Sequence, residues 1–152
     1  MHFEQEIKKL GDGKIKIFVD MDGVIADYIV GEARNYHLKR PIKNNIENLK
    51  RVSEFENVEM YILSISRLAR GAEEKNIWLD EVAPFFKKEN RNIIIREDNG
   101  FMSAIDLKLL FMKHLERDGS KIVMIDDDPE ILDEMQKNFK DLILFKDTVL
   151  VD

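Results

Sequence analysis

Two aspartates followed by a glycine form the part of the sequence best suited to chemistry. Residues 15–19 are mostly β-branched or aromatic, which is typical of a buried strand, and Asp20, Asp22 and Gly23 come after them. At the end of a strand both carboxylates can reach one pocket, and Gly23 permits a backbone bend that a Cβ atom would resist. Two acids at the end of a core strand need a cation or a shared proton, so this segment predicts a catalytic or metal-binding site.

Three other points in the chain carry complementary groups. A second apolar segment ends near Ser64, a predicted helix carries Lys108, and a later apolar segment is followed by Asp126 and Asp127. In open α/β sheets, ligands bind beyond the carboxyl ends of the strands, near the point where the strand order reverses. We therefore expect all these groups to meet the first two aspartates at one edge of a sheet.

A divalent cation would resolve the repulsion within this set of acids. Each close pair of carboxylates costs about 4 kcal/mol at a separation of 4 Å and an effective dielectric constant near 20. A site of oxygen ligands without histidine or cysteine favours Mg²⁺ over Zn²⁺. The sequence thus predicts a magnesium site in which a phosphate ester would complete the coordination of the ion.

The elements that position these residues alternate along the chain. The predicted strands cover residues 14–20, 58–65, 92–96, 121–125 and 142–145. The predicted helices cover residues 3–9, 27–39, 44–55, 72–86, 104–117 and 129–139. This alternation predicts a single α/β domain with a mainly parallel five-stranded sheet.

Composition limits the class of protein. The chain has 152 residues, of which 44% are hydrophobic and 36% charged, and its net charge is −6. These values describe one charged globular domain and argue against nonspecific binding to nucleic acid. The absence of cysteine excludes disulfides and thiolate catalysis. No apolar run is long enough to span a membrane, and residues 1–14 contain no signal-peptide core, so we expect a cytoplasmic protein.

The segment 20–24, Asp-x-Asp-Gly-Val, resembles the signature of the haloacid-dehalogenase-like (HAD) phosphohydrolases. Ser64, Lys108 and the pair at 126–127 resemble the other motifs of that family, so the similarity extends over most of the chain. The segment from Phe18 to Tyr28 is particularly similar to the 5'(3')-deoxyribonucleotidases. The helix of Lys108 resembles that of the phosphatase half of polynucleotide kinases.

The resemblance implies a three-layer Rossmann-like domain and a magnesium-dependent phosphomonoesterase. In that mechanism Asp20 attacks phosphorus to form an aspartyl phosphate, and Asp22 acts as general acid and then as general base. Ser64 and Lys108 would hold the phosphoryl oxygens. The implied metal ligands are Asp20, the backbone carbonyl of Asp22, Asp126 and Asp127.

The spacing of the motifs leaves little room for an additional domain. Many HAD enzymes carry a cap, but the intervals from Asp27 to Ser64 and from Ser64 to Lys108 are too short for a large one. An open site could accept a nucleotide, a nucleic-acid end or another phosphorylated molecule. Arg67 and Arg70 could flank such an anionic substrate or simply form a solvated face, and Asp128, where an Arg often stands, leaves the substrate open.

Two other functions are compatible with clustered aspartates. A noncatalytic regulatory module of receiver type would also accept a phosphoryl group on aspartate. A receiver carries that residue on its middle strand, whereas the middle strands here are expected to end in Ser64 and Arg96. Phosphotransfer to a second acceptor is a third possibility, but it usually needs a cap that excludes water.

Several residues near the motifs admit a structural interpretation. Lys108 is favoured as the phosphate-binding lysine over Lys75 and Lys113. Asp128 precedes a proline at a predicted helix start, so it is favoured as an N-cap. Asp27 is favoured as the cap of the helix that follows the first motif.

Overall fold

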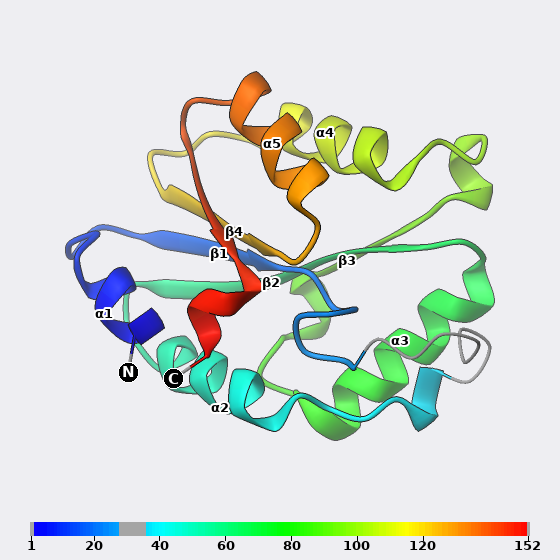
Figure 1. The fold of residues 1–152 in the computed structure, drawn as a ribbon, viewed down its shortest axis with the longest axis horizontal. Coiled ribbons are helices and arrows are strands. Elements are labelled where there is room, and N and C mark those ends of the chain that lie inside the picture. Colours follow the sequence, from blue (N-terminus) through cyan, green and yellow to red (C-terminus); the bar gives the residue numbers. More distant parts are fainter. Residues whose placement is uncertain (1, 28–35, 152) are drawn as a thin grey trace.

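Five parallel strands form the central sheet in the order β3-β2-β1-β4-β5. The computed structural model describes residues 2–27 and 36–151, and Figure 1 shows their arrangement. The strands are β1 (Ile15–Val19), β2 (Val58–Ser66), β3 (Arg91–Ile95), β4 (Lys121–Asp126) and β5 (Leu142–Lys146). The helices are α1 (His2–Lys8), α2 (Lys43–Ser53), α3 (Ala69–Val82), α4 (Ala104–His114) and α5 (Pro129–Asn138). The predicted α/β class and five-stranded sheet are confirmed, and the sheet is parallel throughout.

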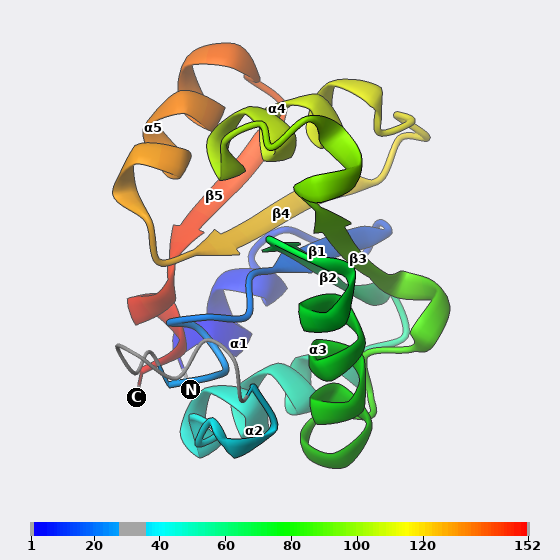
Figure 2. The ribbon, with the colours of Figure 1, turned by 90° about the vertical axis from the view of Figure 1, so that its right-hand side faces the viewer.

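Helices cover both faces of the sheet. Figures 1 and 2 show α4 and α5 above it and α1, α2 and α3 below it. The side chains of β1 alternate between the two layers: Ile17 and Val19 belong to the lower core, whereas Phe18 belongs to the upper core. Burial on both faces explains why the central strands are nearly continuous apolar runs.

The strand order places the catalytic candidates at the centre of the sheet. β1 lies between β2 and β4, with Val19 in register with both Ile62 and Ile125. The strand order reverses at β1 and β4, which is where open α/β sheets bind ligands. The expectation that the middle strands end in Ser64 and Arg96 is therefore wrong. It depends on sequence order, which does not determine the spatial order of strands.

Most predicted helices agree with the structure to within a few residues. The helix expected at 72–86 begins earlier, at Ala69, and ends at Val82 before Pro84. For the helix expected at 27–39, residues 28–35 lie outside the described residues, and Tyr36–Leu38 form a 3-10 turn. The described residues contain no inserted domain. None of the described helices has both the length and the apolar character required to cross a membrane.

Candidate active site

Three carboxylates form an acidic cluster at the ends of β1 and β4. Asp20, Asp126 and Asp127 each offer an oxygen, and these oxygens all lie within 4.8 Å of one another. The backbone N–H of Asp20 donates to the carbonyl of Ile125 at 3.0 Å, which ties the two strand ends together. The acidic cluster lines a pocket of about 440 Å³. A compact group of carboxylate oxygens suits a hard cation such as Mg²⁺.

Lys108 lies against two members of the acidic cluster. Its Nζ is 2.7 Å from Oδ2 of Asp126 and 3.2 Å from Oδ1 of Asp20. The Ser103 hydroxyl caps the start of α4 by accepting from the N–H of Asp106, and Lys108 is buried on the inner side of that helix. Lys113, further along α4, is exposed. The structure therefore brings Lys108, rather than Lys113, to the acidic cluster.

The electrostatics of the cluster are dominated by burial and mutual repulsion. Burial raises the pKa of Asp20 to about 7; Lys108 opposes this shift, and the charges of Asp126 and Asp127 add to it. Burial, and then Asp126, also raise the pKa of Asp127. Burial alone would lower the pKa of Lys108, but Asp20 and Asp126 outweigh it and raise that pKa. One buried lysine therefore does not fully compensate the three acids, which leaves the cluster suited to a further cation.

Asp22 lies apart from the acidic cluster and is held by two lysines. Lys39 Nζ is 2.6 Å from its Oδ1, and Lys75 Nζ is 3.5 Å from its Oδ2. Burial acts to raise the pKa of Asp22, but Lys75 and Lys39 together lower it. The Asp22 side chain is thus not among the grouped metal ligands. A contribution through its backbone carbonyl stays a prediction.

Ser64 is buried at the same edge and contacts Lys75. Lys75 Nζ donates to Oγ of Ser64 at 2.8 Å and to the carbonyl of Ile65 at 2.7 Å. The sequence favours Lys108 over Lys75, yet the structure places both lysines in the site. One signal in the sequence points to Lys75: it occupies the same face of α3 as Ala72 and Leu79, where an apolar residue is expected.

Lys39 is a site residue that the sequence patterns do not reveal. It comes from the segment between the 3-10 turn and α2, and its carbonyl accepts a hydrogen bond from Nε1 of Trp78 at 3.0 Å. Its Nζ also lies 4.6 Å from the centre of the Tyr36 ring. No spacing rule connects Lys39 to the first motif. Its contact with Asp22 depends on the tertiary packing of its segment against Trp78 of α3.

Two flanking aspartates have mainly structural contacts. Asp128 caps α5 by accepting from the N–H of Glu130 at 2.9 Å, which confirms the N-cap prediction. Asp27 accepts from Nη2 of Arg40 at 3.1 Å. The helix that Asp27 is expected to cap falls on residues outside the described part of the chain.

The two arginines after β2 are exposed. The Arg67 guanidinium lies 6.0 Å from the centre of the Phe101 ring, and Arg70 Nε lies 3.8 Å from Oε1 of Glu74. Both contacts are weak at an exposed surface. A role for either arginine in substrate binding stays a prediction.

Gly23 is required by the close approach of Asp127. Its φ is +82°, and a Cβ atom there would lie 2.0 Å from Oδ2 of Asp127. We expect Gly23→Ala to cost about 1–2 kcal/mol of stability through its backbone conformation and a further amount because it displaces Asp127. The control is Gly119→Ala, because Gly119 has φ +90° but open space around it. Urea unfolding of both variants tests this, and equal losses of stability would contradict the clash.

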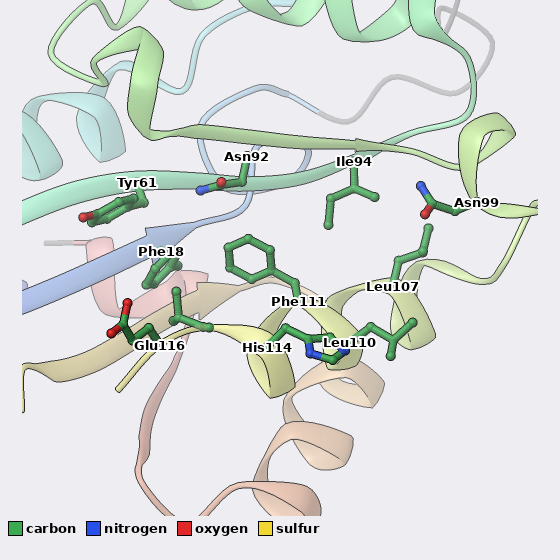
Figure 3. A pocket seen from close by; sticks show the side chains of 11 residues that line it. Phe18, Tyr61, Asn92, Ile94, Asn99, Leu107, Leu110, Phe111, His114 and Glu116 are labelled. Carbon is green, nitrogen blue, oxygen red and sulfur yellow. The ribbon is translucent and has the colours of Figure 1, made fainter. Parts of the chain in front are cut away.

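A separate pocket of about 520 Å³ lies between α4 and the upper face of the sheet (Figure 3). Phe18 stacks on Tyr61 at 4.6 Å and meets Phe111 edge-on at 5.7 Å, so its lining is largely aromatic and aliphatic. Glu116 is the only carboxylate among the described residues that line it. This pocket offers no cluster of groups for phosphoryl chemistry.

Comparison with protein-family models and with curated proteins gives no match to this chain. The site must therefore be interpreted from its own geometry.

Proposed function

We propose that this protein is a magnesium-dependent phosphomonoester hydrolase of the HAD type that acts through an aspartyl phosphate. One observation carries the proposal: the Asp20 carboxylate lies at the end of the central strand, in contact with buried Lys108 and grouped with two further carboxylates. The Asp20 carboxylate thus has the Lys108 ammonium beside it, and the grouped oxygens offer a place for a metal ion. This arrangement suits a nucleophile that attacks a phosphorus atom surrounded by anionic oxygens.

The residues present fit a magnesium ion. Asp20, Asp126 and Asp127 would hold it, because their oxygens are grouped; burial, and then the charges of Asp126 and Asp127, raise the pKa of Asp20 to about 7 despite the opposing effect of Lys108. When bound, the ion would neutralise charge on the phosphoryl group. The chain's own residues do the rest of the chemistry.

The proposed reaction has two halves. In the first, an oxygen of Asp20 bonds to phosphorus, and the ester oxygen leaves with a proton from Asp22. Lys75 and Lys39 lower the pKa of Asp22, so the arriving anionic phosphate ester must raise that pKa before Asp22 can carry the proton. In the second, Asp22 takes a proton from water, whose oxygen attacks phosphorus and releases phosphate and Asp20. Ser64 and Lys108 would hold the phosphoryl oxygens in both halves.

A phosphate on a nucleotide or at a nucleic-acid end is the leading substrate. The pocket is open, and the described residues provide no domain to cover it. Arg67, just after β2, and Arg70, in the first turn of α3, are exposed; in this proposal they would contact the part of an anionic substrate that lies outside the pocket.

A receiver-type regulatory module is the second candidate. It is favoured by the position of Asp20 at the end of the middle strand. A receiver would retain the phosphoryl group on aspartate, whereas a hydrolase releases phosphate repeatedly.

The test is hydrolysis of p-nitrophenyl phosphate, nucleoside monophosphates, 3'-phosphorylated oligonucleotides, phosphosugars and phosphopeptides, with Mg²⁺ and with EDTA. Multiple turnovers that need Mg²⁺ support the hydrolase. Stoichiometric labelling by a small phosphodonor without turnover would instead support the receiver.

In the absence of divalent cations, the free energy of unfolding should depend on pH because Asp20 has a different pKa in the folded and unfolded protein. Its pKa of about 7 lies above the value of 3.8 for an exposed aspartate, so folding favours the protonated form. The stabilisation from this group is complete below about pH 4 and is lost as the pH rises through about 7. We expect Mg²⁺ to raise the Tm of EDTA-treated protein more at pH 8 than at pH 5, as measured by thermal unfolding. Asp20→Asn should reduce this difference, and an unchanged difference would contradict the assignment to Asp20.

A further inference from the structure

Lys75 connects the two sides of the site. It is 4% exposed and comes from α3, below the sheet. Its Nζ contacts Ser64 Oγ at 2.8 Å, the carbonyl of Ile65 at 2.7 Å and Oδ2 of Asp22 at 3.5 Å. An ammonium group has three hydrogens, and these three acceptors account for them.

This contact restricts the hydrogen of the Ser64 hydroxyl. An ammonium group donates and cannot accept, so Oγ of Ser64 must be the acceptor in its bond with Lys75. The hydroxyl hydrogen therefore points away from Lys75. Within residues 2–27 and 36–151, Ser64 Oγ donates to no acceptor, and Ser64 lines the pocket beside Asp20 and Lys108. The hydrogen remains available to a phosphoryl oxygen in that pocket.

We propose that Lys75 is a positioning residue that orients the Ser64 hydroxyl to donate to the phosphoryl group. The proposal rests on the proposed hydrolase function and goes beyond it by giving a role to a lysine that the reaction scheme does not use. Lys75 acts through Ser64 and does not bind the phosphoryl group itself. Without Lys75, the hydroxyl of Ser64 could rotate freely about its Cβ–Oγ bond. The hydrogen bond from the buried ammonium restricts that rotation, and a donor held in its working orientation is more effective in catalysis.

A double-mutant cycle tests this coupling. Ser64→Ala removes the donor, and we expect it to lower kcat/KM by about 10²- to 10³-fold. Lys75→Met removes the group that orients the donor and should lower kcat/KM by at least tenfold, with weaker inhibition by inorganic phosphate. In the Ser64→Ala background, Lys75→Met should have a much smaller effect, because no hydroxyl remains to be oriented.

Lys39→Met is the matched control. Lys39 is also a buried lysine that donates to Asp22, and its Nζ lies 4.6 Å from the centre of the Tyr36 ring. The substitution should change kcat/KM by the same factor in the wild-type and Ser64→Ala backgrounds, and inhibition by inorganic phosphate should change little. A merely structural role of Lys75 would not produce the selective coupling to Ser64.

The outcomes are separable. Suppose that the wild type hydrolyses phosphomonoesters, but the double variant loses kcat/KM by the product of the factors lost in Lys75→Met and Ser64→Ala. Lys75 then acts independently of Ser64, and the proposal is overturned. If the wild type shows no turnover on the whole panel, the hydrolase function fails and this proposal fails with it. Circular dichroism and thermal unfolding check the fold of each variant. If Lys75→Met does not fold, Lys75→Gln completes the cycle, since its amide can still donate to a backbone carbonyl.

Discussion

Asp20→Asn should abolish the turnover of phosphomonoesters, with a loss of at least about 10⁴-fold in kcat, because an amide oxygen is a poor nucleophile toward phosphorus. The substitution keeps the size of the side chain and removes one charge from the acidic cluster. The measurement is release of phosphate in the presence of Mg²⁺, at saturating substrate.

Asp128→Asn is the control for this substitution. It makes the same chemical change at the same edge of the sheet, but Asp128 caps α5, and asparagine is an equally good N-cap. We expect its kcat to stay within a few-fold of wild type. Turnover that survives in Asp20→Asn would exclude Asp20 as the nucleophile.

Lys108→Met should damage both stability and activity. It leaves Asp126, which is fully buried, and Asp20 without their shared ammonium. Removing one partner of a buried ion pair typically costs about 3–5 kcal/mol. We expect a loss of that size in urea unfolding of the metal-free protein, and a loss of about 10³-fold in kcat/KM when Mg²⁺ is present.

Lys113→Met provides the comparison on the same helix. Lys113 is exposed, so the free energy of unfolding of the Lys113→Met variant should differ from that of the wild type by less than about 0.5 kcal/mol. If both variants unfold at the same urea concentration as wild type, the contact of Lys108 with the acidic cluster contributes no net stability.

Local patterns in the sequence are sufficient to predict the elements and much of the site. The apolar runs ending near Asp20, Ser64 and Asp126 are strands, and their ends lie at one edge because all five strands are parallel. The strand ends depend on side-chain periodicity and on rules that hold for parallel sheets generally. Lys108 is selected by the resemblance to the HAD motifs, in which a lysine precedes the second acidic segment.

The remaining features depend on tertiary structure. The central position of β1 follows from the order in which strands pair, which their sequence order does not reveal. Lys39 reaches Asp22 because Trp78 holds its backbone against α3. Lys75 is polar on an otherwise apolar helix face, and only its contacts with Asp22 and Ser64 explain that exception.

The two aspartates of the first motif receive their cations from opposite sides of the sheet. Asp20 contacts Lys108 on α4, above the sheet, whereas Asp22 contacts Lys75 on α3, below it (Figure 1). Residues two apart in one short turn thus belong to two separate packing environments. Repacking one layer would directly alter the lysine contacts of only one of the two aspartates. In the proposed mechanism, bond formation to phosphorus and proton transfer could then be adjusted by different substitutions.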